Sequence, residues 1–294
     1  MADLLDVPYF PFDENGYRLS VGLAPLPSNR WMEPDRLAVQ QLRLRGDLLT
    51  SHREDVLQYR AESAAACLEL NRAVRRHLLE HHPNYACGTE QHIRIASTQV
   101  VLPPPANGLQ GLEQLAHLVQ EDFCILSSES NPTLIAALVC FPSHWKLQEK
   151  MGQTSDAIHA VVPKFADKLA IPTNAILSKL RPNRPVWRIN WSIDGDDSLF
   201  TPGPKSFRDD LSVRNVLHST WLRAERQTLR RLPETGSLVF TIRTYLHRMA
   251  DVAVCPNRRT KLLASLRTMA PDTAAYKGMV AMLPLLIEAL ERLG

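Results

Sequence analysis

Cysteine is scarce in this 294-residue chain, and no two cysteines form a Cys-x-x-Cys pair. The five that occur are far apart and odd in number: Cys67, Cys87, Cys124, Cys140 and Cys255. This pattern argues against a disulfide framework and against a zinc knuckle. It is typical of a reducing compartment, so we expect a cytoplasmic protein.

Charge of one sign and long apolar runs are also missing. The chain has 34 basic and 31 acidic residues, a net charge of +3, and neither sign gathers in a block, so we expect no nucleic-acid partner. No apolar run approaches the ~20 residues of a membrane span. The N-terminus carries Asp3 and Asp6 where a signal peptide needs basic residues. We therefore expect a soluble protein without a membrane partner.

Glycine-rich signatures are absent as well. The sequence contains no Gly-x-Gly-x-x-Gly turn, no Gly-x-x-x-x-Gly-Lys loop and no Gly-x-Ser-x-Gly elbow. This argues against nucleotide binding through those motifs and against Ser-His-Asp catalysis. What the chain does have is 45% apolar residues, the composition of a protein with a buried core.

Prolines and apolar periodicity divide the chain into four parts. Residues 1–34 predict an extended arm pinned by aromatic side chains, and residues 35–102 predict a helical segment packed on the core. Residues 103–250 are rich in strands, and residues 251–294 return to helices. The sum predicts an α+β protein with a small antiparallel sheet between N-terminal and C-terminal helices.

The expected elements follow from local patterns. Strands are expected at 122–127, 134–141, 185–193 and 236–246, and the turn-forming run 129–132 makes the first two an antiparallel hairpin. Helices are expected at these ranges: two or three within 35–82, then 112–119, 154–169 with an interruption at Pro163, 174–180, 258–269 and 279–293.

The strand at 185–193 is the most informative of these elements. It is largely apolar, β-branched or aromatic, yet Arg188 and Asn190 lie two residues apart and therefore share one face. A guanidinium is costly to bury without a partner and its planar fork suits carboxylates. We expect an anionic group over this face.

A second polar segment runs from 223 to 231 and contains four arginines. If it is extended, Arg223, Glu225 and Gln227 share a face, whereas a helix would group Arg223, Arg226 and Arg230. A solvated helix with local ion pairs is the ordinary structure for such a run. The alternative is a floor that binds carboxylates, with Glu225 accepting from an amine or guanidinium.

His159 lies beside Ile158, Val161 and Val162, just before the helix-breaking Pro163. A neutral histidine in apolar surroundings, with one ring nitrogen held by an acceptor, is an ordinary ligand of haem iron. A core histidine or a helix cap is the alternative.

His144 and Trp145 follow a predicted strand and lie at the rim of the sheet. Trp145 could form a wall of a flat cofactor site or could simply pack in the core, and His144 is a reserve iron ligand. His77 and His81 have the i, i+4 spacing of a metal pair, but no third ligand is identifiable.

Four segments together form an ordered series: Cys140-Phe141-Pro142 with Trp145, Ile158-His159 with Val162-Pro163, Arg188-Ile189-Asn190-Trp191, and the run from Leu222 to Pro233. In this series the chain resembles the haem-dependent oxidative N-demethylase family. The resemblance covers roughly residues 9–245 and continues weakly to Lys277. The most specific parts are the Arg-x-Asn-Trp strand and the Arg-Ala-Glu-Arg-Gln run.

The resemblance implies a PAS-like haem-binding core, which we assign to residues 103–250, with haem b as the iron cofactor. It implies a monooxygenase that uses dioxygen to demethylate a small secondary amine such as dimethylamine, releasing formaldehyde. Electrons would come from a separate reductase with flavin and an iron–sulfur cluster, because this chain lacks the clustered cysteines and glycine-rich turns that those groups need.

Residue roles follow as expectations. His159 binds iron, and Glu225 with Asn190 orients the amine or the oxygen species. The predicted cofactor-binding residues are Arg188, Arg223, Arg226, Gln227, Trp145 and Trp191. Two alternatives stay open: a PAS-like haem or small-ligand sensor without catalysis, and a protein that binds an anionic metabolite without haem.

Overall fold

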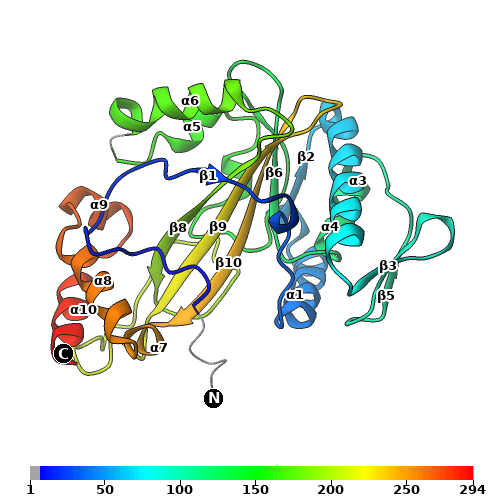
Figure 1. Cartoon of the computed structure of the whole chain (residues 1–294). Coiled ribbons are helices and arrows are strands. Elements are labelled where there is room, and N and C mark those ends of the chain that lie inside the picture. Colours follow the sequence, from blue (N-terminus) through cyan, green and yellow to red (C-terminus); the bar gives the residue numbers. More distant parts are fainter. Residues whose placement is uncertain (1–6, 164, 294) are drawn as a thin grey trace.

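The centre of the protein is a seven-stranded antiparallel sheet in the order β1-β8-β9-β10-β6-β7-β2 (Figure 1). The computed structural model describes residues 7–163 and 165–293. The acidic N-terminus considered above, the first six residues of the predicted arm, therefore lies outside the described residues. The strands are β1 (Ala24–Pro25), β2 (Leu57–Tyr59), β6 (Asp122–Leu126), β7 (Leu134–Leu138), β8 (Val186–Asp194), β9 (Trp221–Arg231) and β10 (Leu238–Arg248).

The predicted α+β class is confirmed. Helices precede, interrupt and follow the sheet: α1 (Ala38–Ser51), α2 (Arg53–Val56), α3 (Ala64–His81), α4 (Gly108–Ala116), α5 (Ser155–His159), α6 (Ala170–Lys179), α7 (Met249–Ala253), α8 (Pro256–Arg267), α9 (Pro271–Tyr276) and α10 (Met282–Glu291). Single 3-10 turns lie at η2 (Ser28–Arg30), η3 (Ala61–Ser63), η4 (Thr89–Gln91) and η5 (Leu147–Glu149), and η6 (Phe165–Leu169) is a π-turn. No described helix is long and apolar enough to cross a membrane.

The charged segment 223–231 is a strand, β9, so its extended alternative is correct. β9 pairs along its length with β10 on one side and with β8 on the other. Pairing on both edges satisfies the backbone groups of this polar run, which outweighs the helical tendency of its arginines.

The two faces of the sheet differ. One face, here the helix-covered face, carries Phe123, Ile125 and Val239, which pack with α1, α3 and α4 in the largest apolar cluster. In Figure 1 these helices lie together on one side of the sheet, while α5 and α6 lie at one end, α7 lies at the other end of β9 and β10, and α8–α10 lie beyond β8. The opposite face carries apolar side chains near α6 and polar side chains along β8 and β9. It is called the polar face below.

A buried ion pair lies at the end of the hairpin formed by β6 and β7 and holds the segment that follows β7. Arg45 of α1 lies 2.6 Å from Asp122 of β6, and both side chains are inaccessible to solvent. Asp122 also accepts from the backbone N–H groups of Cys140 and Phe141. Because this carboxylate is fully used, residues 140–141 are held in place, and the Phe141 carbonyl can then accept from Arg223.

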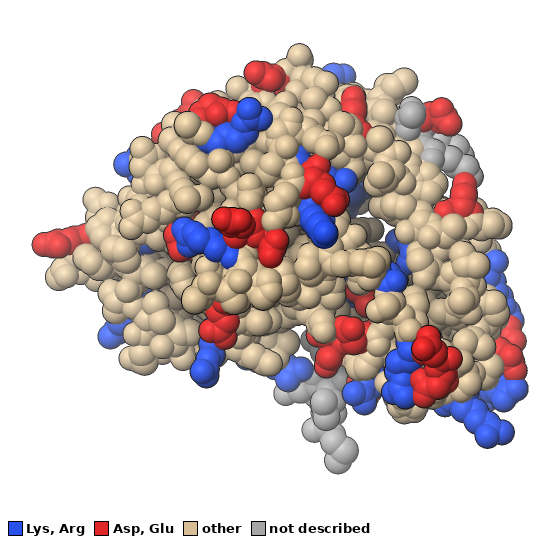
Figure 2. Space-filling view, turned by 180° about the vertical axis from the view of Figure 1, so that it is seen from behind, with Lys and Arg blue, Asp and Glu red and all other residues tan. Residues whose placement is uncertain are grey.

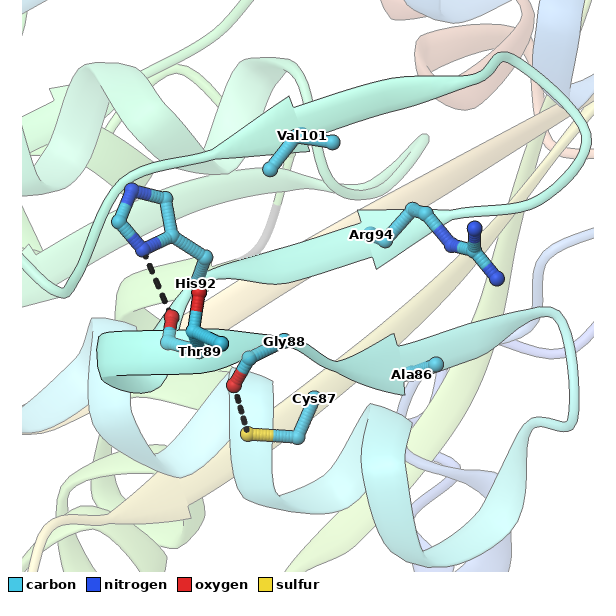
Figure 3. A pocket seen from close by; sticks show the side chains of 7 residues that line it. All are labelled: Ala86, Cys87, Gly88, Thr89, His92, Arg94 and Val101. Carbon is cyan, nitrogen blue, oxygen red and sulfur yellow. Dashed lines mark hydrogen bonds between the residues drawn. The ribbon is translucent and has the colours of Figure 1, made fainter.

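A small second sheet was not predicted. Strands β3 (Tyr85–Cys87), β4 (Ile93–Ile95) and β5 (Val100–Leu102) form it within the segment expected to be helical, and three residues per strand leave almost no sequence periodicity. A hollow of about 330 Å³ lies on this sheet beside Cys87 and His92 (Figure 3). None of the predicted site residues lines it.

Tyr9, Phe12 and Trp31 of the N-terminal segment are buried. This segment is also held by His77 of α3, whose Nε2 accepts from the backbone N–H of Met32 at 3.2 Å. An accepting nitrogen carries no proton, so this contact requires the neutral ring.

Acid should loosen the arm through His77. Burial lowers the pKa of His77 to about 4, so between about pH 6.5 and 4 the unfolded chain binds a proton that the folded protein does not. Stability should therefore fall as pH falls through this window. In urea denaturation, the free energy of unfolding of His77→Gln, whose amide oxygen can still accept from the Met32 N–H, should fall less with falling pH than that of the wild type. The exposed variant His81→Gln should behave as the wild type. If the free energy of unfolding depended on pH equally in all three proteins, this role of His77 would be contradicted.

Candidate functional site

Polar side chains of two neighbouring strands meet on the polar face. Residues of β9 pair in register with residues of β8, so that Arg223 lies opposite Ser192, Glu225 opposite Asn190 and Gln227 opposite Arg188. Directly opposed residues of an antiparallel pair point to the same side. The structure thus brings together five of the predicted site residues: Arg188, Asn190, Arg223, Glu225 and Gln227.

Glu225 is the centre of this patch. Its Oε2 accepts from Asn190 Nδ2 at 3.2 Å and from Gln227 Nε2 at 3.1 Å, and its Oε1 lies 3.4 Å from Arg223 Nε. Glu225 is 7% exposed and Arg223 is inaccessible, whereas Asn190 is exposed. The carboxylate is therefore nearly buried, with Oε2 held by the two amides and Oε1 turned toward Arg223.

Arg188 is the accessible cation of the patch. Its Nε donates to Gln227 Oε1 at 2.8 Å and its Nη1 lies 3.5 Å from the Val21 carbonyl of the arm. No described residue accepts a hydrogen bond from its Nη2. Burial lowers the pKa of Arg188, while Glu225 and Tyr276 act in the opposite direction. A guanidinium held by one edge and free at the other is suited to bind a carboxylate.

His159 is the last residue of α5, and the hydroxyl of the N-cap residue Thr154 accepts from the Ala157 N–H. The Nδ1 of His159 lies 2.7 Å from the Ser155 carbonyl, which can only accept, so Nδ1 carries the proton and Nε2 has the lone pair. The ring stacks on Phe165 with a centroid distance of 5.2 Å. Burial lowers the pKa of His159, and the charge of Arg188 contributes in the same direction.

This is the geometry of an imidazole prepared to bind a metal. The ring is neutral, its orientation is fixed by one carbonyl, and within the described chain no residue is hydrogen bonded to Nε2. Its neighbour Ile158 packs with Phe240 of β10, on the side of the sheet that carries the polar patch. The described residues contain no group of three or more His, Cys, Asp or Glu able to hold a metal ion.

Trp145 lies beside the helix that carries His159. It is half-buried and packs in an apolar cluster with Ile158 of α5 and Phe240 of β10. Phe240 lies opposite Leu229, which is on the same face as Glu225 and Gln227. Trp145 is therefore on the same side of the sheet as the polar patch and provides it with an apolar neighbour.

His144, the reserve ligand, is held by a hydrogen bond at one ring nitrogen and lies near a carboxylate at the other. Its Nδ1 lies 3.1 Å from the Gly203 carbonyl and its Nε2 lies 3.4 Å from Asp194 Oδ1. The His144 Nε2 has no hydrogen-bond partner among the described residues, but it lies against the Asp194 carboxylate, whereas the His159 Nε2 faces no such acceptor.

Two predicted site residues lie on the helix-covered face instead. Arg226 donates to the carbonyls of Arg30 and Trp31 and lies 3.4 Å from Glu33. Trp191 packs edge-on against Phe12, with ring centroids 4.7 Å apart. Both hold the arm, because strand alternation turns positions 191 and 226 away from positions 190 and 225.

Two lysines at this edge were not identified from the sequence. Lys277 Nζ donates to the Trp191 carbonyl at 2.6 Å and Lys205 Nζ donates to the Ile193 carbonyl at 2.9 Å. β1 pairs only with residues 186–187 of β8, so these lysines cover carbonyls on its open edge. Burial lowers the pKa of Lys277 to about 8. Nothing in the local sequence marks either residue, because each reaches β8 from a distant segment.

The far side of the molecule is hollowed between the region of α5 and α6 and the C-terminal helices, and charged side chains of both signs lie around the hollow (Figure 2). A neutral imidazole on α5 thus lies on the side of the sheet that carries the free guanidinium edge of Arg188, and an imidazole and a guanidinium are groups able to bind a haem iron and a propionate. The model of the family described as haem-dependent oxidative N-demethylase, alpha subunit-like, matches residues 22–286. The chain belongs to this family.

Proposed function

We propose that the protein is a haem-dependent monooxygenase that oxidatively demethylates a small secondary amine of the dimethylamine type and releases formaldehyde. One observation carries the proposal: His159, with a free Nε2, lies on the same side of the sheet as the Arg188–Glu225 patch. The family name adds haem dependence and oxidative N-demethylation.

The residues present fit haem b. His159 Nε2 would bind the iron, Trp145 would contact the macrocycle, and the free edge of Arg188 would bind a propionate. Arg223 contacts Glu225, and Gln227 accepts from Arg188, so both hold the site residues in position. Bound haem supplies oxygen activation and electron transfer, which no amino-acid side chain provides.

The chain's own residues bind and orient the amine. A secondary amine is a cation near neutral pH, and Glu225 is the carboxylate that faces the exposed Asn190. We assign Glu225 to the ammonium group and the Asn190 amide to its orientation or to that of dioxygen. Arg223 and Gln227 hold the carboxylate in one position, so its charge is in place before substrate arrives.

We propose the sheet region 103–250 as the PAS-like haem-binding core, the helical segment 35–102 as a layer packed on it, and residues 1–34 and 251–294 as the arm and the C-terminal helices. Strands β1 and β2 come from outside the proposed core and extend its sheet at both edges. The arm contributes directly, because the Val21 carbonyl contacts Arg188.

Electrons come from a separate reductase with flavin and an iron–sulfur cluster, and the reaction takes place in the cytoplasm. Dimethylamine, dioxygen, two electrons and two protons give methylamine, formaldehyde and water. All five cysteines of the chain are free and unclustered, in agreement with a cluster on another polypeptide.

Haem-loaded protein tests the function directly. With dimethylamine, dioxygen and a flavin/iron–sulfur reductase it should release formaldehyde in proportion to the oxygen consumed, and omission of the amine should prevent formaldehyde release. A spectral change on ligand addition without formaldehyde would support the sensor alternative. Protein that takes up no haem but co-purifies with an anion would support the metabolite alternative.

A further inference from the structure

Lys277 lies at the end of α9, beside the open edge of β8. Its Nζ donates to the Trp191 carbonyl at 2.6 Å and lies 4.4 Å from the centre of the Trp191 ring. Trp191 follows Asn190 of the polar patch, so the ammonium group contacts the strand next to the site. Gly278, at φ 65°, ends the helical turn directly after Lys277, and a Cβ added there would lie 3.1 Å from Lys205 Cδ. The end of α9 therefore packs closely against this edge.

The two carboxylates near Lys277 are Asp194 and Glu225, and each already has a cation within the protein. Lys205 Nζ lies 2.8 Å from Asp194, and Arg223 Nε lies 3.4 Å from Glu225. Arg223 is wholly buried and donates to the Phe141 carbonyl at 2.6 Å, so its position is fixed. Buried carboxylates need such partners. These two ion pairs therefore account for both negative charges.

Arg188 and Lys277 are the cations that remain. Within the described chain, neither forms an ion pair with a carboxylate. Arg188 donates to the Gln227 amide and the Val21 carbonyl, and Lys277 donates to a single backbone carbonyl. All of these acceptors are neutral, and an ammonium group has three N–H donors. The two side chains thus have both unused donors and uncompensated charge, which an anionic ligand can satisfy.

The pKa of Lys277 agrees with an excess of positive charge at this edge. Burial lowers this pKa to about 8, and the charges of Lys205 and Arg188 act in the same direction. The two nearby carboxylates oppose this effect only in part. An anion bound at Nζ would favour the charged form of the amine and offset the cost of burying it.

One ligand can meet both unpaired cations. Arg188 and Trp191, whose carbonyl holds Lys277, are three residues apart on an extended strand, which is about 10 Å. Arginine and lysine side chains are long enough to approach each other over this distance. Haem b carries two propionates, and only one of them is assigned above, to Arg188. The number of unpaired cations therefore equals the number of propionates.

We propose that Lys277 binds the second haem propionate, while Arg188 binds the first. The inference rests on the proposed function and adds to it a cofactor-binding residue from the C-terminal helices. The Trp191 carbonyl and ring hold the ammonium group beside the polar patch before haem binds. Haem binding thereby depends on the packing of α9 against β8.

Esterified haemin tests this charge pairing without turnover. Haemin and its dimethyl ester, which lacks both propionate charges, are titrated into the wild type and into Lys277→Met, and binding is followed in the Soret region. Methionine retains a flexible apolar side chain against Trp191 but has no charge. Lys277→Met should bind haemin about 10-fold more weakly than the wild type and should bind the ester equally well. Lys277→Arg, which keeps the charge, should retain most of the haemin affinity.

Lys261→Met is the matched control, because it removes a lysine from α8 of the same C-terminal helices. It should leave both affinities unchanged. Wild-type haemin affinity in Lys277→Met, or an equal loss for haemin and the ester, would overturn this inference alone. A wild type that binds neither haemin nor the ester would instead overturn the proposed function.

Chemical labelling of the wild type provides a second measurement that needs no variant. Acetic anhydride acetylates lysine amines, and mass spectrometry of peptides gives the rate at each lysine. Bound haemin should slow acetylation of Lys277 several-fold and leave the rate at Lys261 unchanged. A rate at Lys277 that is the same with and without bound haemin would contradict the inference.

Discussion

His159→Ala should remove the Soret band that we expect from the purified protein, or weaken haemin binding by about 100-fold or more. The free Nε2 of His159 is the nitrogen that we assign to iron, and its orientation is fixed by the Ser155 carbonyl. Alanine removes the ligand and leaves space for a small molecule. Imidazole in the buffer should therefore restore a histidine-like spectrum in the variant.

Two other histidines provide the comparison. His218→Ala changes an exposed side chain and should leave the spectrum unchanged. His144→Ala should also retain the band, because the His144 Nδ1 is hydrogen bonded to the Gly203 carbonyl and its Nε2 lies 3.4 Å from the Asp194 carboxylate. A band that survives in His159→Ala and disappears in His144→Ala would reverse the assignment of the iron ligand.

Glu225→Gln should lower kcat/KM for dimethylamine by about 10² to 10⁴ while haem binding is retained. Glutamine has nearly the same shape and can still accept from Asn190 and Gln227, but it carries no charge to bind an ammonium group. It also leaves Arg223 with one carboxylate fewer. Stopped-flow reduction and formaldehyde assays separate loss of amine binding from loss of haem.

The control for this variant is Glu234→Gln, in the exposed turn between β9 and β10. It removes the same charge from the same hairpin and should leave kcat/KM unchanged. If Glu225→Gln turned over dimethylamine at the wild-type rate, Glu225 would not be the amine-binding carboxylate.

Much of the polar face could be predicted from strand periodicity alone. Arg188 and Asn190 lie two apart in an apolar run, and the extended form of 223–227 places Arg223, Glu225 and Gln227 on one side. What periodicity does not contain is the register between the strands. The pairing of Asn190 with Glu225 follows from the complete sheet and makes one site of two separate motifs.

The same alternation explains why Arg226 and Trp191 are not with the others. Both belong to the motifs that carry the family resemblance, but each is one residue away from a position on the polar face. A motif shows which residues occur together in sequence. The face to which each side chain points depends on whether its position along the strand is odd or even. Arg226 and Trp191 bind the arm to the sheet.

Contacts between distant segments could not be predicted. Lys205 and Lys277 reach the edge of β8 from a loop and from the end of α9, and His144 reaches Asp194 through a backbone conformation that its sequence does not indicate. The three strands of the small sheet are too short for a periodic signal. These features depend on long-range packing.

A titration of purified wild-type protein with haemin, followed by absorbance in the Soret region, tests the central claim most directly. We predict a sharp band that saturates at equimolar haemin and has the form of a histidine-ligated b-type haem. A spectrum that stays that of free haemin, or a titration identical to that of His159→Ala, would contradict the account.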